Sequence, residues 1–199
     1  MIRNTAVTVC GPLNVNKLGV TYVHEHLMVK PQLPDEYYIP YTLDDEAAST
    51  EETRSFSAAG GETLVEMTPI NYGRNVKAYQ RIAQATGVHV ICCTGFHKQL
   101  FMPPWFGDKT DGELYDILMD EVTNGLDDTE IHPGVIKLGT SFEEVTAAEK
   151  RSIEAVARVH RDTGIPISTH CDKGTMGMDQ LRLLEKHGVD PKNVLLCHI

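Results

Sequence analysis

The sequence lacks an uninterrupted apolar run of the roughly 18 residues that a membrane-spanning helix needs. Its first residues also lack the apolar stretch and the small-residue cleavage site of a secretory signal peptide. We therefore expect no membrane partner and a cytoplasmic protein.

Basic residues are too few to balance the acidic ones. The chain has 18 Lys and Arg residues against 28 Asp and Glu residues, which gives a formal net charge of −10. Binding a polyanion over a broad surface needs clustered Lys and Arg side chains, so this balance argues against nucleic acid as a partner. The five cysteines are odd in number and show no paired spacing, which favours reduced core thiols over a disulfide framework or a zinc ribbon.

What the chain does have is the composition of one soluble domain, with 41% hydrophobic and 23% charged residues over 199 positions. Six apolar segments are typical of strands, and stretches of helical periodicity separate them. These strands are expected at residues 20–27, 63–67, 88–93, 134–138, 165–170 and 193–198. An earlier segment, residues 5–10 followed by Gly11 and Pro12, is typical of one arm of a short hairpin.

Helix signals lie between these strands. Thr146 and Glu149 have capping-box spacing before a helix that Gly164 ends. Two more helices are expected at residues 76–85 and 178–187, each followed by a glycine. A regular order of strand, helix, glycine and strand indicates parallel βα units.

Polar residues at strand ends favour a barrel over an open sheet. His26, Lys137, His170 and His198 lie at or near the carboxyl ends of their strands, where a barrel gathers its catalytic groups. No glycine-rich phosphate loop follows the first strand, which removes the commonest reason to prefer a Rossmann-like sheet. We expect an α/β fold, a (β/α)₈ TIM barrel with a short N-terminal hairpin. About six of its eight βα units are present, because the chain stops at Ile199 on the sixth strand.

His24 and His26 are two apart on a predicted strand, so both imidazoles project from the same face. Together they can hold one divalent metal. A pair of surface or core histidines is the alternative interpretation, and Glu25 between them should point to the opposite face.

Lys137 lies in a segment that otherwise predicts a strand buried on both faces, where an ammonium is costly. Burial depresses a lysine pKa, and the neutral amine can react with carbon dioxide to form an anionic carbamate that can bridge two cations. The alternative is a lysine that extends its charged end to solvent. His170 and His198 each end a strand beside a cysteine, Cys171 or Cys197, whose thiol should point the other way.

Taken together, these residues resemble the phosphotriesterase family of the amidohydrolase superfamily. The pattern comprises the His24-Glu25-His26 segment, Lys137 at the fourth strand, and His170 and His198 at the fifth and sixth. Three further segments resemble family sequences, and they are residues 18–21, 72–75 and 93–96.

The resemblance implies that residues 1–199 form a single metal-dependent hydrolase barrel domain, incomplete at its C-terminus. By that resemblance His24 and His26 would bind the more buried of two divalent metals, and His170 and His198 the more exposed one. Carboxylated Lys137 would bridge the two metals, with Zn²⁺ the commonest occupant. A hydroxide shared by the metals would be the nucleophile, since metal binding lowers the pKa of water from 15.7 towards about 7.

The family also places an aspartate at the end of the eighth strand, and none of Asp172, Asp179 and Asp190 can take that role by position. A catalytically inactive fragment that acts at most as a binding or assembly partner is therefore an alternative. A TIM-barrel deoxyribonuclease is a further alternative, although such enzymes place a glutamate where Lys137 stands and need a surface that tolerates a phosphate backbone.

Residues 96–105 mix aromatic and basic side chains in a loop expected at the rim of the site, unless its aromatics pack on neighbouring helices. By similarity, His97 would lie nearest the leaving group or ring of the substrate, and Lys98 would meet an anionic substituent. We expect a small-molecule ester or lactone as substrate, with a phosphorylated sugar lactone as the hypothesis and phosphotriester cleavage as a side activity. The resemblance allows a homodimer, although no sequence feature fixes the oligomeric state.

Overall fold

The computed structural model describes residues 4–33 and 42–199. The chain divides into two compact units, which are described separately. The first unit comprises Met1–Thr68, Tyr72–Cys93 and Asn124–Gly134, and the second comprises Pro69–Asn71, Thr94–Thr123 and Val135–Ile199. That residues 1–199 form one domain stays a prediction.

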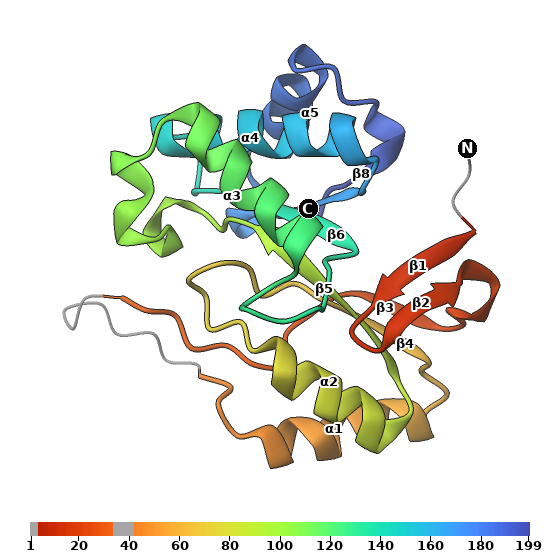
Figure 1. Cartoon of the computed structure of the whole chain (residues 1–199). Helices are drawn as coiled ribbons and strands as arrows, with labels where there is room; N and C mark the ends of the chain where they lie inside the picture. Colours follow the sequence, from red (N-terminus) through yellow and green to blue (C-terminus); the bar gives the residue numbers. More distant parts are fainter. Residues whose placement is uncertain (1–3, 34–41) are drawn as a thin grey trace. The chain divides into compact units, whose positions relative to one another are not determined.

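An antiparallel hairpin begins the first unit, as predicted. It pairs β1 (Thr5–Thr8) with β2 (Gly11–Asn14), and Thr8 lies opposite Gly11 (Figure 1). Gly11 and Pro12 therefore start the second strand, and the turn lies at residues 9–10. The backbone N–H of Val9 in this turn donates to the Val90 carbonyl at 2.9 Å, which joins the hairpin to the strand at Val90.

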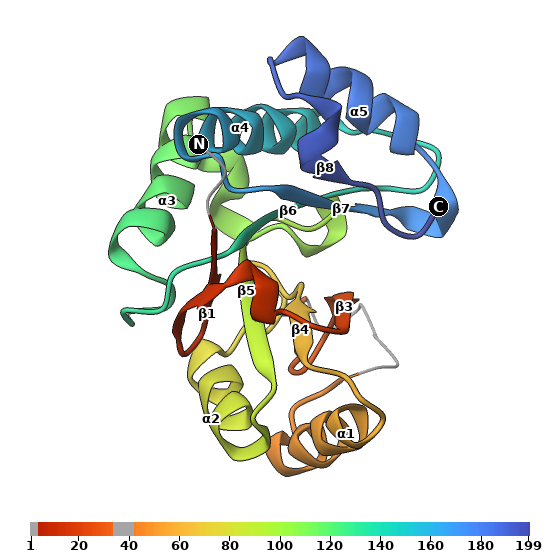
Figure 2. The ribbon, with the colours of Figure 1, turned by 90° about the vertical axis from the view of Figure 1, so that its right-hand side faces the viewer.

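Parallel strands β3 (Thr21–Glu25), β4 (Thr63–Glu66) and the first part of β5 (His89–Gly95) follow one another in the first unit. Helices α1 (Glu46–Ala58) and α2 (Val76–Thr86) lie beside each other (Figures 1 and 2). The Asn75 side chain caps α2 by accepting from the Ala78 N–H, and left-handed Gly87 ends it. The buried side of α2 includes Val76, Tyr79, Ile82 and Ala83, whose spacing is that of one helical face.

The second unit also alternates parallel strands with helices. Strands β6 (Val135–Thr140), β7 (Ile167–Cys171) and β8 (Val194–Leu195) pair in parallel. Helices α3 (Asp111–Asn124), α4 (Ala147–Thr163) and α5 (Gly177–Lys186) accompany them, and α4 lies next to α5 (Figure 2). The predicted capping box of Thr146 and Glu149 begins α4, and left-handed Gly164 ends it.

Short 3₁₀ helices occupy several connections in the two units. They are η1 (Val15–Lys17), η2 (Gln99–Phe101), η3 (Pro104–Asp108), η4 (Asp172–Gly174) and η5 (Pro191–Asn193). None of the helices in the described ranges has the length and apolar composition that crossing a membrane requires.

Two strand boundaries differ from the prediction in ways that matter for the candidate site. β6 continues to Thr140, so Lys137 is its third residue and does not end the strand. β8 ends at Leu195, where a strand to His198 was predicted. His198 itself has φ of 62°, a left-handed conformation that does not occur in an extended strand.

Candidate functional site

The two predicted histidines of the first unit lie at the end of β3. His24 is the fourth residue of that strand, and His26 follows directly after it. Their ring centroids are 5.5 Å apart, and the His26 ring also meets Tyr72 edge-on at 5.8 Å. The structure therefore brings the two imidazoles together, as the spacing predicted. Burial raises the pKa of Glu25, which lies between them.

A buried acid, which the sequence analysis did not single out, lies behind His26. The Thr68 hydroxyl lies 2.8 Å from His26 Nδ1 and 2.6 Å from Glu66 Oε1. Glu66 and Thr68 are both fully buried. Burial raises the pKa of Glu66 to about 7, opposed by hydrogen bonds from Thr68 and from the Leu27 N–H. The available signal was an acidic residue at the end of an otherwise apolar strand.

Lys137 in the second unit is fully buried, and so are the other five residues of β6. The prediction of a strand buried on both faces is confirmed. Gly95 at the end of β5 has φ of 110°, and a Cβ there would collide with the Lys137 carbonyl oxygen. Glycine therefore permits the close approach through which the Phe96 N–H donates to the Lys137 carbonyl at 3.2 Å.

Three imidazoles form a row in the second unit. The centroid of the His170 ring lies 4.5 Å from that of His97 and 4.8 Å from that of His198. His170 Nε2 is buried and makes no hydrogen bond to any described residue, although Asp172 Oδ1 lies 3.9 Å away. The Gln180 amide of α5 donates to the His170 carbonyl at 2.8 Å and so fixes this end of β7.

Burial lowers the pKa of His170 to about 3, and the nearby charges of Lys137 and Lys98 lower it further. Burial also lowers the pKa of His198, with Lys137 as the second cause. Both rings are therefore neutral at pH 7. The neutral imidazole is the form that binds a metal.

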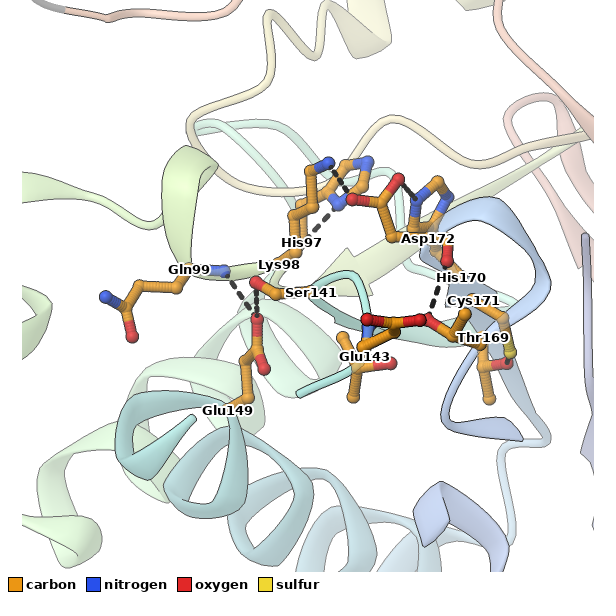
Figure 3. A network of polar contacts seen from close by, with 12 residues as sticks. His97, Lys98, Gln99, Ser141, Glu143, Glu149, Thr169, His170, Cys171 and Asp172 are labelled. Atoms are coloured by element: carbon orange, nitrogen blue, oxygen red, sulfur yellow. Dashed lines mark hydrogen bonds and ion pairs between the residues drawn. The ribbon is translucent and has the colours of Figure 1, made fainter. Parts of the chain in front are cut away.

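Of the two predicted substrate residues, His97 belongs to this row and Lys98 follows it in the chain. His97 is buried, its Nδ1 accepts from the Lys98 N–H at 2.7 Å, and its ring meets Phe101 at 4.8 Å. Lys98 Nζ lies 2.6 Å from Asp172 Oδ2, and Figure 3 shows these two side chains and His170 pointing toward one another. The ammonium is therefore already paired with a carboxylate of the same unit.

The backbone of this loop is held by Glu149, which is fully buried at the start of α4. Its carboxylate accepts from the Gln99 N–H at 2.9 Å and from the Ser141 hydroxyl at 2.7 Å (Figure 3). Its second oxygen accepts from the Thr146 N–H at 2.8 Å. Gly139 of β6 makes room for the loop, since a Cβ there would lie 2.9 Å from the Lys98 nitrogen.

Part of the loop follows the alternative interpretation. The rings of Phe96 and Phe106 are buried 5.0 Å apart, and Trp105 packs edge-on against Phe96 at 6.2 Å. These aromatics belong to the hydrophobic core of the second unit. His97 instead belongs to the row of imidazoles, and Lys98 pairs with Asp172 beside it.

The three aspartates that could not be placed at an eighth strand each have another partner. Asp172 pairs with Lys98, and Asp179 lies 3.4 Å from Arg182 on the same helix. Asp190 accepts from the Lys192 N–H at 3.0 Å and caps η5. Each of the three carboxylates thus has a partner within its own unit.

The donor atoms of the second unit fit a divalent metal only if Lys137 joins the imidazoles. Within the described residues, no three His, Cys, Asp or Glu side chains are grouped so that they could hold a metal ion by themselves. The second unit does contain two neutral imidazoles and a buried lysine, and a carbamate on that lysine would add two oxygen donors. His170 Nε2, buried with no hydrogen bond to a described residue, is an atom that such a cation would satisfy.

Comparison with known proteins shows how closely this chain follows one family. Residues 4–199 match the model of the phosphotriesterase family. The chain is 34% identical over 187 residues to the phosphotriesterase homology protein of Escherichia coli (strain K12), covering 94% of this chain and 64% of that protein. It is 31% identical over 215 residues to the phospho-furanose lactonase of Mycoplasmopsis synoviae (strain 53), covering 100% of this chain and 61% of that protein.

The solved structure of a lactonase from Listeria monocytogenes aligns with a TM-score of 0.92 at 30% identity, covering 98% of this chain and 65% of that chain. This likeness confirms the predicted α/β fold of the (β/α)₈ barrel type. The chain spans less than two thirds of the length of each of these three proteins. On the match over residues 4–199 and these identities, the chain belongs to the phosphotriesterase family.

Proposed function

We propose that the protein is a metal-dependent hydrolase that opens a lactone. The observation that carries the proposal is the burial of Lys137, at 0% exposure, in the unit that holds the neutral imidazoles of His170 and His198. Burying an ammonium costs free energy, which paired charges and hydrogen bonds must offset. A carbamate on its nitrogen would turn a buried cation into an anionic metal ligand.

The assignment of ligands follows the family resemblance. His24 and His26 would hold one divalent cation, His170 and His198 would hold the second, and carboxylated Lys137 would be shared. Zn²⁺ suits this set of imidazole and carboxylate-like donors. Two bound cations would supply Lewis-acid chemistry there, lowering the pKa of water and polarising a carbonyl.

The chain's own residues prepare the site for this chemistry. Burial keeps His170 and His198 neutral, so both can act as ligands without first losing a proton. The hydrogen bond from the Lys98 N–H leaves His97 with its proton on Nε2, because Nδ1 is the acceptor. Nε2 is thus the donor nitrogen of the His97 ring.

A phosphorylated sugar lactone is the substrate we propose, with phosphotriester cleavage as a side activity. Two of the similar proteins are named as a phospho-furanose lactonase and a lactonase. Lys98 offers a cation for a phosphate, and its side chain keeps 18% of its exposure although it is paired with Asp172. The family match favours this hydrolase over the deoxyribonuclease considered above.

The proposal can be tested on the complete protein by metal analysis and by assays on a panel of aldonolactones and their phosphates. We expect about two equivalents of Zn²⁺ and turnover of a phosphorylated lactone, both lost in Lys137→Ala. Lys150→Ala, at an exposed position on α4, is the matched control and should retain both. Efficient cleavage of a phosphotriester with no turnover of any lactone would overturn the substrate, and a fully active protein without bound metal would overturn the mechanism.

A further inference from the structure

A short chain of buried polar atoms runs from the ring of His26 to the carboxylate of Glu66. His26 Nδ1 lies 2.8 Å from Thr68 Oγ1, and Thr68 Oγ1 lies 2.6 Å from Glu66 Oε1. Glu66 ends β4, and Thr68 lies two residues further along. Both side chains are fully buried, so bulk water does not compete for these hydrogen bonds.

The neighbours of Glu66 set the direction of these hydrogen bonds. Oε1 accepts from the Leu27 N–H at 3.2 Å, and Oε2 accepts from the Thr68 N–H at 3.2 Å. Because backbone donors already address both oxygens, the carboxylate acts as an acceptor, and the Thr68 hydroxyl donates to it. A hydroxyl has one proton, so Thr68 Oγ1 faces His26 as an acceptor and His26 Nδ1 carries the proton.

A proton on Nδ1 leaves the lone pair of the neutral ring on Nε2. This is the arrangement in which a histidine binds a metal through Nε2 while its other nitrogen is held by a hydrogen-bond acceptor. We propose that Thr68 and Glu66 are positioning residues that fix His26 in the Nδ1–H tautomer and so prepare Nε2 to bind a divalent cation. The tautomer stands on the geometry alone, whereas the cation rests on the proposed function.

If both hydrogen bonds ran in the opposite direction, His26 would have the other tautomer. If Glu66 donated to Thr68, the hydroxyl would donate to Nδ1, and the proton of the neutral ring would lie on Nε2. In that tautomer His26 could not bind a cation through Nε2. The position of one proton on one imidazole therefore decides the proposal.

Nitrogen-15 NMR of histidine-labelled complete protein at pH 8, with metal removed, reads that position directly. Multiple-bond correlations should show a protonated Nδ1 for His26 in the wild type and in Thr68→Ser, which keeps the hydroxyl. Thr68→Val should lose the fixed tautomer. Thr53→Val is the matched control, because Thr53 is also buried and its hydroxyl donates to the Ser49 carbonyl of its own helix at 2.7 Å. An Nε2–H tautomer in the wild type, or an unchanged His26 in Thr68→Val, would overturn the proposal.

The second part of the proposal is that Nε2 of His26 is prepared to bind a cation. The affinity for Zn²⁺, measured by competition with a chromophoric chelator, tests it. Loss of a hydrogen-bond partner of a ligating histidine weakens metal binding by about 10- to 100-fold, and we expect this for Thr68→Val but not for Thr68→Ser or Thr53→Val. A wild type that binds no Zn²⁺ would refute the proposed function. The NMR result would then still decide the tautomer of His26. Equal Zn²⁺ affinities in the wild type and Thr68→Val would refute the claim that Thr68 prepares His26 Nε2 to bind a cation. The proposed function would not be affected by that result.

Discussion

Asp172 Oδ2 lies 2.6 Å from Lys98 Nζ, and Asp172 Oδ1 lies 3.9 Å from His170 Nε2. One carboxylate therefore faces both the cation proposed to meet the substrate and a ring proposed to bind metal. The pair is partly exposed, with 18% of Lys98 and 21% of Asp172 accessible. An anionic group that reaches Lys98 must share this ammonium with Asp172 or displace it.

Removing the charge of Asp172 should therefore favour phosphorylated substrates. We expect Asp172→Asn to raise the ratio of kcat/KM for a phosphorylated lactone to kcat/KM for its unphosphorylated form by about 1.4- to 5-fold, since a partly exposed ion pair is worth about 0.2–1 kcal/mol. Steady-state kinetics on the two lactones measure this ratio. Asp179→Asn removes the same charge from an exposed pair on α5 and should leave the ratio unchanged. An unchanged ratio in Asp172→Asn would mean that Lys98 does not contact the phosphate.

Such a prediction could not have been made from the sequence, which places Lys98 and Asp172 74 positions apart. The helix boundaries at Thr146 and Gly164 were predictable because a cap is formed by residues within one turn of the chain. The strands were predictable from apolar runs bounded by glycine. Local signals thus gave the order of βα units.

The details of the candidate site depend on contacts that no local pattern encodes. Thr68 was not singled out because its partner His26 lies 42 positions away, although Glu66 was visible as an acid at a strand end. His198 was predicted to lie on a strand because Val194 to Cys197 are apolar or small, but its left-handed backbone takes it off the strand. The residue types that indicated metal chemistry were available from the sequence, and their surroundings were not.

The burial of Lys137 predicts a difference between stability and activity. In metal-free protein at low carbon dioxide, Lys137 is a buried amine in a strand whose six residues are all buried. Lys137→Met keeps the length of the side chain and removes the amine that would carry the carbamate, so we expect the metal-free protein to stay folded, with a free energy of unfolding within about 3 kcal/mol of the wild type. Urea titrations after chelation measure this value, and hydrolysis by the metal-loaded variant should be lost.

Lys150→Met on the exposed side of α4 should change neither the free energy of unfolding nor the hydrolysis. A metal-free Lys137→Met variant that is unfolded without urea, or a metal-loaded variant that still hydrolyses the lactone, would contradict this prediction.

Glu149 predicts a loss of stability centred on the loop that carries Lys98. Its carboxylate accepts hydrogen bonds from Gln99, Ser141 and Thr146 without access to solvent. Glu149→Gln puts an amide donor where one oxygen accepted a hydrogen bond, which should cost about 1–3 kcal/mol in the free energy of unfolding. Glu185→Gln at an exposed position of α5 should cost little. Urea denaturation of the two variants measures the difference, and equal stabilities would show that water replaces these hydrogen bonds.

The cysteines predict a pattern of alkylation that checks the first unit without any assumption about function. Cys10 is exposed, whereas Cys92 is fully buried in β5. Burial raises the pKa of the Cys92 thiol to about 12. The thiolate is the reactive form, and a raised pKa means that the neutral thiol persists to higher pH, so even at pH 9 only about one Cys92 in a thousand would be ionised. We expect iodoacetamide to label Cys10 within minutes in native protein between pH 7 and 9, with Cys92 labelled only after unfolding in urea. Mass spectrometry of tryptic peptides reads both sites, and labelling of native Cys92 at the rate of Cys10 would show that β5 is not buried as described.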